Sequence, residues 1–583
     1  MMRTNTCGEL SKGDIGKKVD LGGWIHSRRD HGGIIFIDLR DRYGLTQIVF
    51  DPKHNEKTHS EAGHLKREDV IIIKGKVRAR GKELENPKLK TGEIEVIVDE
   101  LKIVAKAKTP PIEVDDRIES SEELRLKYRY LDLRRPVMYK RLLLRHKAAQ
   151  AAREFFDKNN FLEVETPMLV RATPEGARDY VVPSRVSPGN FYALPQSPQL
   201  YKQLLMIAGF DRYYQIARCL RDEDLRQDRQ PEHTQIDLEM SFAEKEDIMA
   251  TVEEMYKHIF KKVLGIDLKD KFSVHSYKEV MDKYGIDKPD LRFGLELMDV
   301  TEAVKKSDFE VFKKAPMVKC INPEGEISRK EIDSLTDFAT KNGAKGLAWA
   351  KVTDNGLESS IAKFFNKDVQ KKLLDKTKAK KGSILFFVAD REKTVNEVMS
   401  KLRVELANRL NLIKPGEWKF LWVVDFPLFE WDEENNAWTP AHHMFSKPKK
   451  ECIDLLEKDP GKVIADLFDI VLNGVELGSG SIRITEPELQ KRVMKVIGLT
   501  HEQAQHKFGF LLDAYQYGAP QHGGMGLGFD RLVALMCGIN DIREVIAFPK
   551  NKAAECPMDG SPSDIPDEQL KELGIKLDVV KKG

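Results

Sequence analysis

Residues 214–242 read YQIARCLRDEDLRQDRQPEHTQIDLEMSF, and this segment decides both the expected fold and the expected chemistry. Apolar residues at 213–217 predict one strand, and residues 234–241 predict a second with acidic side chains at every second or third position. Charged residues of both signs occupy the hairpin: Arg218, Arg221, Asp222, Glu223, Arg226, Arg229, Asp237 and Glu239. Because side chains two apart on a strand share a face, arginines and carboxylates should line one wall.

A wall of this composition suits a phosphate substrate accompanied by a divalent metal. Arginine makes paired hydrogen bonds to phosphate oxygens, and carboxylates hold Mg²⁺. The alternative interpretation is a solvated, salt-bridged hairpin, and charge alone favours that alternative.

A second motif lies near the C-terminal end, where residues 525–531 read MGLGFDR and open an apolar helical run. Glycines let the backbone approach a ligand, and an arginine at the start of a helix can meet a nucleotide triphosphate. Three elements therefore follow one another in a fixed order: a strand ending at Pro167, an Arg-x-Glu hairpin, and Gly-x-Gly-x-Asp-Arg.

Length and composition set the wider limits. A chain of 583 residues predicts three or four domains, and 41% hydrophobic with 33% charged residues excludes a mainly disordered chain. The net charge of +2 neither requires nor excludes a nucleic-acid partner. Six scattered cysteines without a CxxC pair predict reduced thiols in a cytoplasmic protein and no structural zinc. No apolar run is long enough for a signal peptide or a membrane span, so we expect no membrane association.

The chain organisation is expected to be multidomain α+β. Five short β-rich runs (19–26, 34–38, 46–50, 70–77 and 94–103) predict an OB-type barrel over residues 1–105, with a small β-sandwich as the alternative. A proline-containing linker at 106–137 should lead to residues 138–286, which start with a helix at 138–159 and a strand at 161–166. Residues 287–412 read as an inserted α+β domain, and strand patterns return at 413–556. Residues 557–583 form a C-terminal extension that looks like a solvated tail.

The three ordered elements resemble motifs 1, 2 and 3 of class II aminoacyl-tRNA synthetases, with Pro167, Arg221-Asp222-Glu223 and residues 526–531 as the matching positions. Four further stretches narrow the resemblance to the bacterial aspartyl-tRNA synthetases: YRYLDLR (128–134), TPEGARD (173–179), QSPQLYK (196–202) and TQIDLE (234–239). The insertion, with GAKG at 343–346, is similar to the GAD domain of those enzymes. The resemblance runs from the N-terminus to about Pro549. It implies an OB-fold barrel, an antiparallel-sheet catalytic domain, a homodimer formed through motif 1, and transfer of aspartate to the 3′-terminal adenosine of tRNA-Asp.

For ATP and its Mg²⁺, the resemblance implies three catalytic groups. Arg221 would hold the α-phosphate, Glu223 would face adenine, and Arg531 would hold the γ-phosphate. The remaining ATP-site residues are Asp222, Gln230, His233, Glu476, Gly528 and Asp530, and the Mg²⁺ ligands are Asp469 and Glu476. Transfer at the α-phosphorus needs mainly positioning and charge neutralisation, because the substrate carboxylate itself attacks. The family usually has phenylalanine where this chain has His233. A histidine ring still stacks on adenine, but ATP affinity could become lower or pH-dependent.

For L-aspartate, the resemblance assigns Lys202 and Arg483 to the side-chain carboxylate and Asp237 to the ammonium group. The other aspartate-site residues are Glu175, Ser197, Gln199, Arg221, Gln235 and His442. Such a site penalises asparagine, which cannot neutralise two buried cations. His442 and His443 could also suggest a metal pair. Adjacent residues on a strand point in opposite directions, which argues against that interpretation.

The tRNA-binding residues are expected in the barrel. An apolar run around Phe36 by itself predicts core packing, whereas the resemblance predicts that Phe36 and Gln47 read the central uridine, with Arg29 and Asp30 beside it. His31 stands where tRNA-Asp-specific enzymes carry leucine. We therefore hypothesise relaxed specificity that includes tRNA-Asn and a functional link to a tRNA-dependent amidotransferase. A second determinant is expected around residues 81–85.

Competing interpretations remain open at this point. A strictly tRNA-Asp-specific enzyme differs only in its tRNA range. An asparaginyl or lysyl enzyme shares the barrel and the motifs, but the GAD-like insertion and QSPQLYK argue against both. A binding protein without catalysis would not need Arg221, Glu223, Glu476 and Arg531, and a small-molecule ligase would not need the barrel.

Overall fold

The computed structural model describes residues 2–173, 177–323 and 325–578. The chain divides into two compact units, Met1–Arg145 with Arg543–Asp564, and His146–Ile542 with Ile565–Gly583. None of the described helices is both long enough and apolar enough to cross a lipid bilayer.

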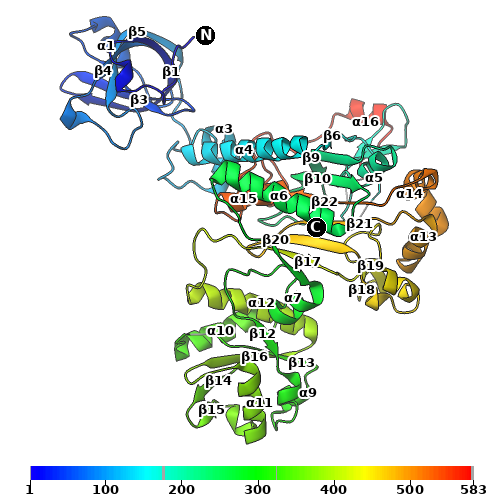
Figure 1. The fold of residues 1–583 in the computed structure, drawn as a ribbon. Helices are drawn as coiled ribbons and strands as arrows, with labels where there is room; N and C mark the ends of the chain where they lie inside the picture. The colour runs from blue at the N-terminus through cyan, green and yellow to red at the C-terminus, as the bar shows by residue number, and fades with distance from the viewer. Residues whose placement is uncertain (1, 174–176, 324, 579–583) are drawn as a thin grey trace. The chain divides into compact units, whose positions relative to one another are not determined.

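The first unit contains a closed five-stranded barrel, blue in Figure 1, whose strands pair in the order β1-β2-β3-β5-β4. Their bounds are β1 Lys18–His31, β2 Ile34–Arg40, β3 Leu45–Phe50, β4 Val70–Ala79 and β5 Ile94–Ala105. Helix α1 (Glu56–Ala62) connects β3 to β4, and α2 (Glu122–Lys127) and α3 (Arg129–Asp132) follow the barrel. Closure of the sheet excludes the β-sandwich alternative.

Every second side chain of β2 points into the barrel and helps to form its core. On β2, Ile35, Ile37 and Leu39 are buried in the barrel core, while Phe36 and Asp38 between them are only half-buried. Since successive side chains of a strand point to opposite faces, Phe36 belongs to the outer face of the barrel. The expectation of core packing for Phe36, based on the apolar run alone, is therefore wrong.

The second unit is built on an eight-stranded sheet in the order β11-β17-β20-β21-β22-β10-β9-β6. The inner pairs are antiparallel, whereas the edge pairs β11–β17 and β6–β9 are parallel. The bounds are β6 Leu162–Glu163, β9 Arg212–Leu220, β10 Glu232–Ser241, β11 Ser273–Ser276, β17 Phe420–Val424, β20 Leu467–Leu472, β21 Val475–Ile482 and β22 His522–Gly528. Two small hairpins accompany it, β7 (Val181–Pro183) with β8 (Phe191–Ala193), and β18 (Phe429–Asp432) with β19 (Ala437–Pro440).

Helices accompany this sheet, and α5 and α15 both contact the central strand β10. Their bounds are α4 Pro136–Lys158, α5 Gln199–Ile207, α6 Lys245–Leu264, α7 Tyr277–Tyr284, α13 Pro487–Val496, α14 His501–Ala514, α15 Phe529–Met536 and α16 Asp567–Leu573. Strand β22 can lie close to β10 because of its glycines. A Cβ at Gly524 would overlap the Leu238 carbonyl and the Glu239 carboxylate.

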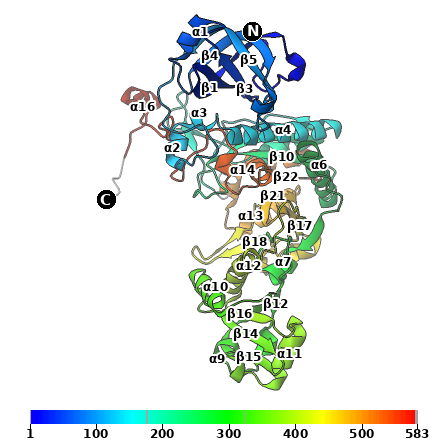
Figure 2. The same cartoon turned by 90° about the vertical axis from the view of Figure 1, so that its left-hand side faces the viewer.

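The insertion forms its own five-stranded sheet in the order β12-β13-β16-β14-β15, drawn in green in Figures 1 and 2. Its strands are β12 Leu297–Asp299, β13 Met317–Ile321, β14 Ala348–Thr353, β15 Gly356–Glu358 and β16 Ile384–Asp390. Its helices are α8 Thr301–Val304, α9 Glu310–Lys314, α10 Arg329–Lys341, α11 Lys367–Thr377 and α12 Glu392–Arg409. Strand β16 is buried on both faces, because Phe386 packs with α10 and α12 while Phe387 packs with α8, α9 and α11.

The α+β fold class is confirmed, and the differences from expectation are local. The strand predicted at 161–166 is reduced to β6, which has two residues. Strand patterns at 480–484 and 526–529 predict two strands there, and the corresponding β21 and β22 begin earlier, because their glycines weaken the strand pattern. The C-terminal extension is not only a solvated tail, since it includes helix α16 with a buried Leu570.

Candidate active site

A cavity of 780 Å³ opens in the second unit against β10, β21 and β22. It brings together most of the residues predicted for ATP and aspartate: Ser197, Gln199, Lys202, Arg221, Asp222, Glu223, Gln230, His233, Gln235, Asp237, His442, Glu476, Arg483, Gly528, Asp530 and Arg531. Asp469 is not in the cavity wall. Glu175 lies outside the described residues.

One end of the cavity holds a buried network of two cations and two carboxylates. Lys202 Nζ lies 2.8 Å from Asp237 Oδ1 and 3.2 Å from Glu239 Oε2. Arg483 makes a fork on Glu239, with Nε donating to Oε1 at 2.8 Å and Nη2 donating to Oε2 at 3.0 Å. All four side chains are at most 2% exposed. Burial at this depth fixes the charges in place and leaves little water to screen them.

The two carboxylates have different protonation behaviour. Burial, together with the negative charge of Glu239, outweighs Lys202 and raises the pKa of Asp237 to about 6. Burial acts on Glu239 in the same direction, but Arg483 and Lys202 outweigh it and lower the pKa of Glu239 to about 2. Among the described residues, the buried Asp237 Oδ2 has no hydrogen-bond partner. That oxygen is a ready acceptor for an ammonium group of a ligand.

Two members of this network were given no role in the aspartate site by the sequence prediction. Glu239 stands two residues after Asp237 on β10, so its place on the same face could have been read from the strand period. His443 Nε2 accepts a hydrogen bond from Arg483 Nη1 at 2.8 Å. Burial and the neighbouring Arg483 lower the pKa of His443 well below its usual value, so its ring is neutral.

The premise that His442 and His443 lie on a strand is wrong. Both residues lie in a loop after β19, not on a strand, and both line the cavity. His442 Nε2 lies 3.3 Å from Asp469 Oδ2, and burial is outweighed by this carboxylate, which raises the pKa of His442. Among the described residues, no group of three histidine, cysteine or acidic side chains could hold a metal ion.

The other end of the cavity carries the hairpin between β9 and β10. Arg221 follows β9 directly, and its backbone N–H donates to the Pro231 carbonyl at 2.8 Å, which closes the hairpin. Glu223 accepts a hydrogen bond from Arg229 at 3.0 Å. Arg531 on α15 donates to the Glu476 carbonyl at 3.0 Å and to Asp228 at 3.2 Å. These contacts place cations on two sides of a polar cavity, which suits a polyphosphate chain.

His233 lines the same cavity as these two cations. Burial and the positive charges of Arg221 and Arg531 lower its pKa to about 3. The ring is therefore neutral near pH 7 and can stack on a base as phenylalanine does. The pH-dependent ATP affinity hypothesised from the sequence has no support in this environment.

The fit of a divalent metal rests on Glu476 and Asp469. Glu476 on β21 lines the cavity, whereas Asp469 on β20 is 2% exposed and lies behind His442. The second oxygen of Asp469, Oδ1, has no hydrogen-bond partner among the described residues. Glu476 is the one of these two carboxylates that faces the cavity, and it fits Mg²⁺, which is usually held by one or two protein carboxylates, substrate phosphates and water.

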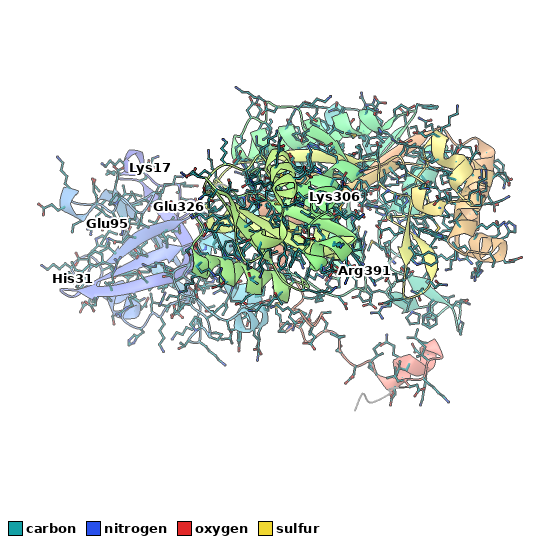
Figure 3. The ribbon with its side chains drawn as sticks, turned by 90° about the horizontal axis from the view of Figure 1, so that it is seen from below. Lys17, His31, Glu95, Lys306, Glu326 and Arg391 are labelled. Carbon is teal, nitrogen blue, oxygen red and sulfur yellow. The ribbon has the colours of Figure 1, made fainter. Side chains whose placement is uncertain are left out.

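The barrel presents a separate polar surface in the first unit. Arg29 Nη2 donates to Asp38 at 3.0 Å and to Gln47 Oε1 at 3.3 Å, and Gln47 Nε2 donates to Glu95 Oε2 at 2.7 Å. Phe36 is the cross-strand partner of Arg29, and Asp30 is the partner of Ile35. Figure 3 labels His31, at the end of β1, and Glu95, a member of this surface that the sequence prediction missed. Aromatic, amide and cationic side chains are therefore neighbours on this surface of the barrel, and the recognition of unpaired bases requires such a combination.

Comparisons with known proteins agree with this geometry. The family model described as tRNA synthetases class II (D, K and N) matches residues 121–552, and the OB-fold nucleic acid binding domain matches residues 19–104. The chain is 53% identical over 585 residues to the Aspartate--tRNA(Asp/Asn) ligase of Caldanaerobacter subterraneus subsp. tengcongensis, covering 99% of both chains. It is 50% identical over 592 residues to the protein of the same name from Aquifex aeolicus, covering 99% of this chain and 98% of that one.

Two solved structures are similar to this chain in fold. Asparaginyl-tRNA synthetase from Pyrococcus horikoshii, complexed with asparaginyl-adenylate, matches with a TM-score of 0.59 and 22% identity over 94% of this chain and 98% of that one. A putative aspartyl-tRNA synthetase from Leishmania major matches with a TM-score of 0.60 and 18% identity over 94% of each chain.

Proposed function

The chain belongs to the class II tRNA synthetases of the D, K and N group and is an aminoacyl-tRNA ligase, and we propose that it joins L-aspartate to tRNA in two steps. In the first step, a carboxylate oxygen of aspartate bonds to the α-phosphorus of ATP. The bond between that phosphorus and the bridging oxygen breaks, and pyrophosphate leaves. In the second step, a hydroxyl of the 3′-terminal adenosine of tRNA takes the aspartyl group, and AMP leaves.

The buried charge network is the observation that carries the choice of aspartate. Lys202 and Arg483 are held in place by Asp237 and Glu239, so the side-chain carboxylate of aspartate meets cations that are already oriented. The unpartnered Oδ2 of Asp237 supports a role in holding the substrate ammonium. The network alone has two cations and two carboxylates, and the substrate ammonium adds a third cation. The side-chain carboxylate of aspartate balances that charge, whereas the neutral amide of asparagine would leave one buried positive charge uncompensated.

ATP occupies the opposite end in this proposal. Arg221 contacts the α-phosphate, Arg531 contacts the γ-phosphate, Glu223 faces the adenine and His233 stacks on it. Glu476 and Asp469 would hold Mg²⁺, which supplies charge neutralisation at the phosphates when bound. Arg221 stabilises the negative charge that grows on the α-phosphate during attack, and the fixed hairpin orients it before the reaction.

The tRNA partners are tRNA-Asp and tRNA-Asn. The relatives named for both tRNAs support this range, as does His31 at the exposed end of β1. Aspartyl-tRNA-Asn requires a tRNA-dependent amidotransferase as its next enzyme. We place the reaction in the cytoplasm, since all six cysteines are free. The active form is a homodimer through the segment after Pro167, where Met168 and Leu169 are exposed apolar side chains.

Two measurements test this function. Aspartate should support exchange of label between pyrophosphate and ATP, and the protein should then charge purified tRNA-Asp and tRNA-Asn. Absence of aspartate-dependent exchange would overturn the assignment of the first step. Charging of tRNA-Asp alone would reduce the proposal to a strictly tRNA-Asp-specific enzyme.

A further inference from the structure

The connection at residues 287–295 leads from α7 into the insertion, and a buried arginine of the insertion holds it. Arg403 on α12 is 1% exposed. Its Nη2 donates to the carbonyls of Asp290 at 2.8 Å, Phe293 at 3.0 Å and Gly294 at 2.8 Å, and its Nε donates to the Leu295 carbonyl at 3.0 Å. A single guanidinium therefore holds four backbone carbonyls of this connection.

The same connection is also packed against the catalytic sheet. Asp290 is 6% exposed and receives a fork of hydrogen bonds from Arg292. It lies on the turn between β20 and β21, where Gly474 has a φ of +83° and a Cβ would come within 3.2 Å of the Asp290 Cβ. The connection is thus held on one side by the insertion and on the other by the strands that build the cavity.

Lys288 is the side chain that this connection presents to the nucleotide end of the cavity. Its Nζ lies 3.6 Å from Glu476 Oε2. It lines the main cavity and an adjoining cavity of 280 Å³, and Asp228, Glu476 and Arg531 line both as well. Arg531 approaches the same Glu476 carboxylate at 3.9 Å. Two cations therefore flank one carboxylate, and Lys288 remains 41% exposed and able to turn toward an anion.

Resting on the proposed ATP-dependent activation, we propose that Lys288 binds the terminal phosphates of ATP and the departing pyrophosphate, and that Arg403 positions it. The Lys288 ammonium stabilises negative charge that accumulates on the leaving pyrophosphate oxygen. A lysine is a suitable group here, because it acts as a mobile point charge that can follow the pyrophosphate as it leaves. The insertion thereby takes part in adenylate formation by holding a residue of the site, although its own helices and sheet lie outside the cavity.

Direct binding separates this role from a general effect on the fold. Lys288→Met should weaken ATP binding about tenfold in calorimetric titration, the loss of one charge-assisted hydrogen bond. AMP lacks the terminal phosphates, so its affinity should stay within about twofold of the unaltered protein. The matched control is Lys283→Met, since Lys283 is 42% exposed and also pairs with a glutamate, Glu279, at 3.2 Å. Unchanged ATP affinity, or an equal loss of AMP affinity, would overturn the proposal.

The positioning role of Arg403 requires a double-mutant cycle. Arg403→Lys should raise the ATP KM of exchange while leaving the aspartate KM unchanged, and it should add little once Lys288→Met is present. Additive effects would show that Arg403 does not act through Lys288. Lys288→Arg retains the positive charge and should recover ATP binding, so the role of Lys288 is still tested where Arg403→Lys fails to fold. Wild-type protein without aspartate-dependent exchange would contradict the proposed function, whereas the ATP and AMP titrations would still decide the role of Lys288.

Discussion

The aspartate end of the cavity and the polar surface of the barrel use the same kinds of side chain in opposite environments. Arg483 and Glu239 are 1% and 0% exposed, whereas Arg29 and Asp38 are 55% and 15% exposed. Buried charges are little screened and cannot move away from a wrong ligand, so they discriminate strongly. Exposed charges are screened by water and salt, so each contributes little and can change at little cost to stability. Under the proposed function, this contrast explains why the choice of amino acid would be strict while the choice of tRNA can vary.

The largest expected effect follows from removing one charge of the buried network. Glu239→Gln leaves Arg483 and Lys202 without their shared carboxylate and should lower the free energy of unfolding by about 3–5 kcal/mol. Aspartate-dependent exchange should fall by a factor on the order of 10³, because both cations lose their orientation. Denaturant unfolding and the kcat/KM for aspartate measure the two effects.

A surface pair with the same geometry gives the matched control. Arg492 makes a fork on Glu457 with both distances at 2.8 Å, but the two side chains are 38% and 42% exposed. Glu457→Gln should lower the free energy of unfolding by only about 0.2–1 kcal/mol and leave exchange unchanged. Equal losses in the two variants would contradict the contrast between buried and exposed charge.

A pH series should reveal the raised pKa of Asp237. Below its pKa of about 6, Asp237 becomes protonated and no longer holds the substrate ammonium. The kcat/KM for aspartate should therefore fall about tenfold between pH 7 and pH 5. For stability the sign is opposite: because folding raises this pKa, the stabilising contribution is complete below the unfolded value near 3.8 and is lost as pH rises through 6. A flat kinetic profile over this range would remove Asp237 from the ammonium site.

A substitution of His31 in the barrel should change the charging of only one of the two tRNAs. His31→Leu introduces the residue of tRNA-Asp-specific enzymes and should lower kcat/KM for charging tRNA-Asn by about tenfold, since one base-reading contact contributes roughly that much. Charging of tRNA-Asp and the free energy of unfolding should not change, because His31 is exposed. A proportional loss for both tRNAs would assign His31 to general tRNA binding.

The smallest effect is expected at His233. Since its pKa is about 3, the ring is neutral throughout the range from pH 6 to pH 8. His233→Phe should change the ATP KM by no more than about threefold, the difference between two neutral stacking rings. The ratio of the two KM values should be constant across that pH range. A ratio that varies with pH would show that His233 titrates in the enzyme.

Sequence reasoning predicted the parts of the fold that have strong local patterns. The five alternating runs of the barrel, the hairpin of β9 and β10, and helix α15 after the glycines all follow from side-chain period and turn residues. The first residues of β22 and the two-residue length of β6 could not be predicted from side-chain period and turn residues. Glycine-rich HGGMGLG has low strand propensity, and its pairing with β10 depends on the close approach that only the assembled sheet reveals.

The site residues divide in a similar way. Residues within the recognised motifs were found, because their spacing persists in the linear sequence. The roles of Glu239 and His443 in the network were missed, since both depend on contacts with Arg483, which lies 244 residues from Glu239 and 40 residues from His443 along the chain. Lys288 is a further example: nothing in its neighbours along the sequence indicates that the fold brings it to Glu476.

The central claim is that a buried charge network selects aspartate, and the most direct test compares two amino acids on the unaltered protein. ATP–pyrophosphate exchange should be measured with L-aspartate and with L-asparagine under identical conditions. The network predicts a kcat/KM for aspartate higher by a factor on the order of 10⁴, since asparagine brings an ammonium group but no side-chain carboxylate to balance it, and one buried positive charge stays uncompensated. Exchange with asparagine within about tenfold of that with aspartate would contradict it.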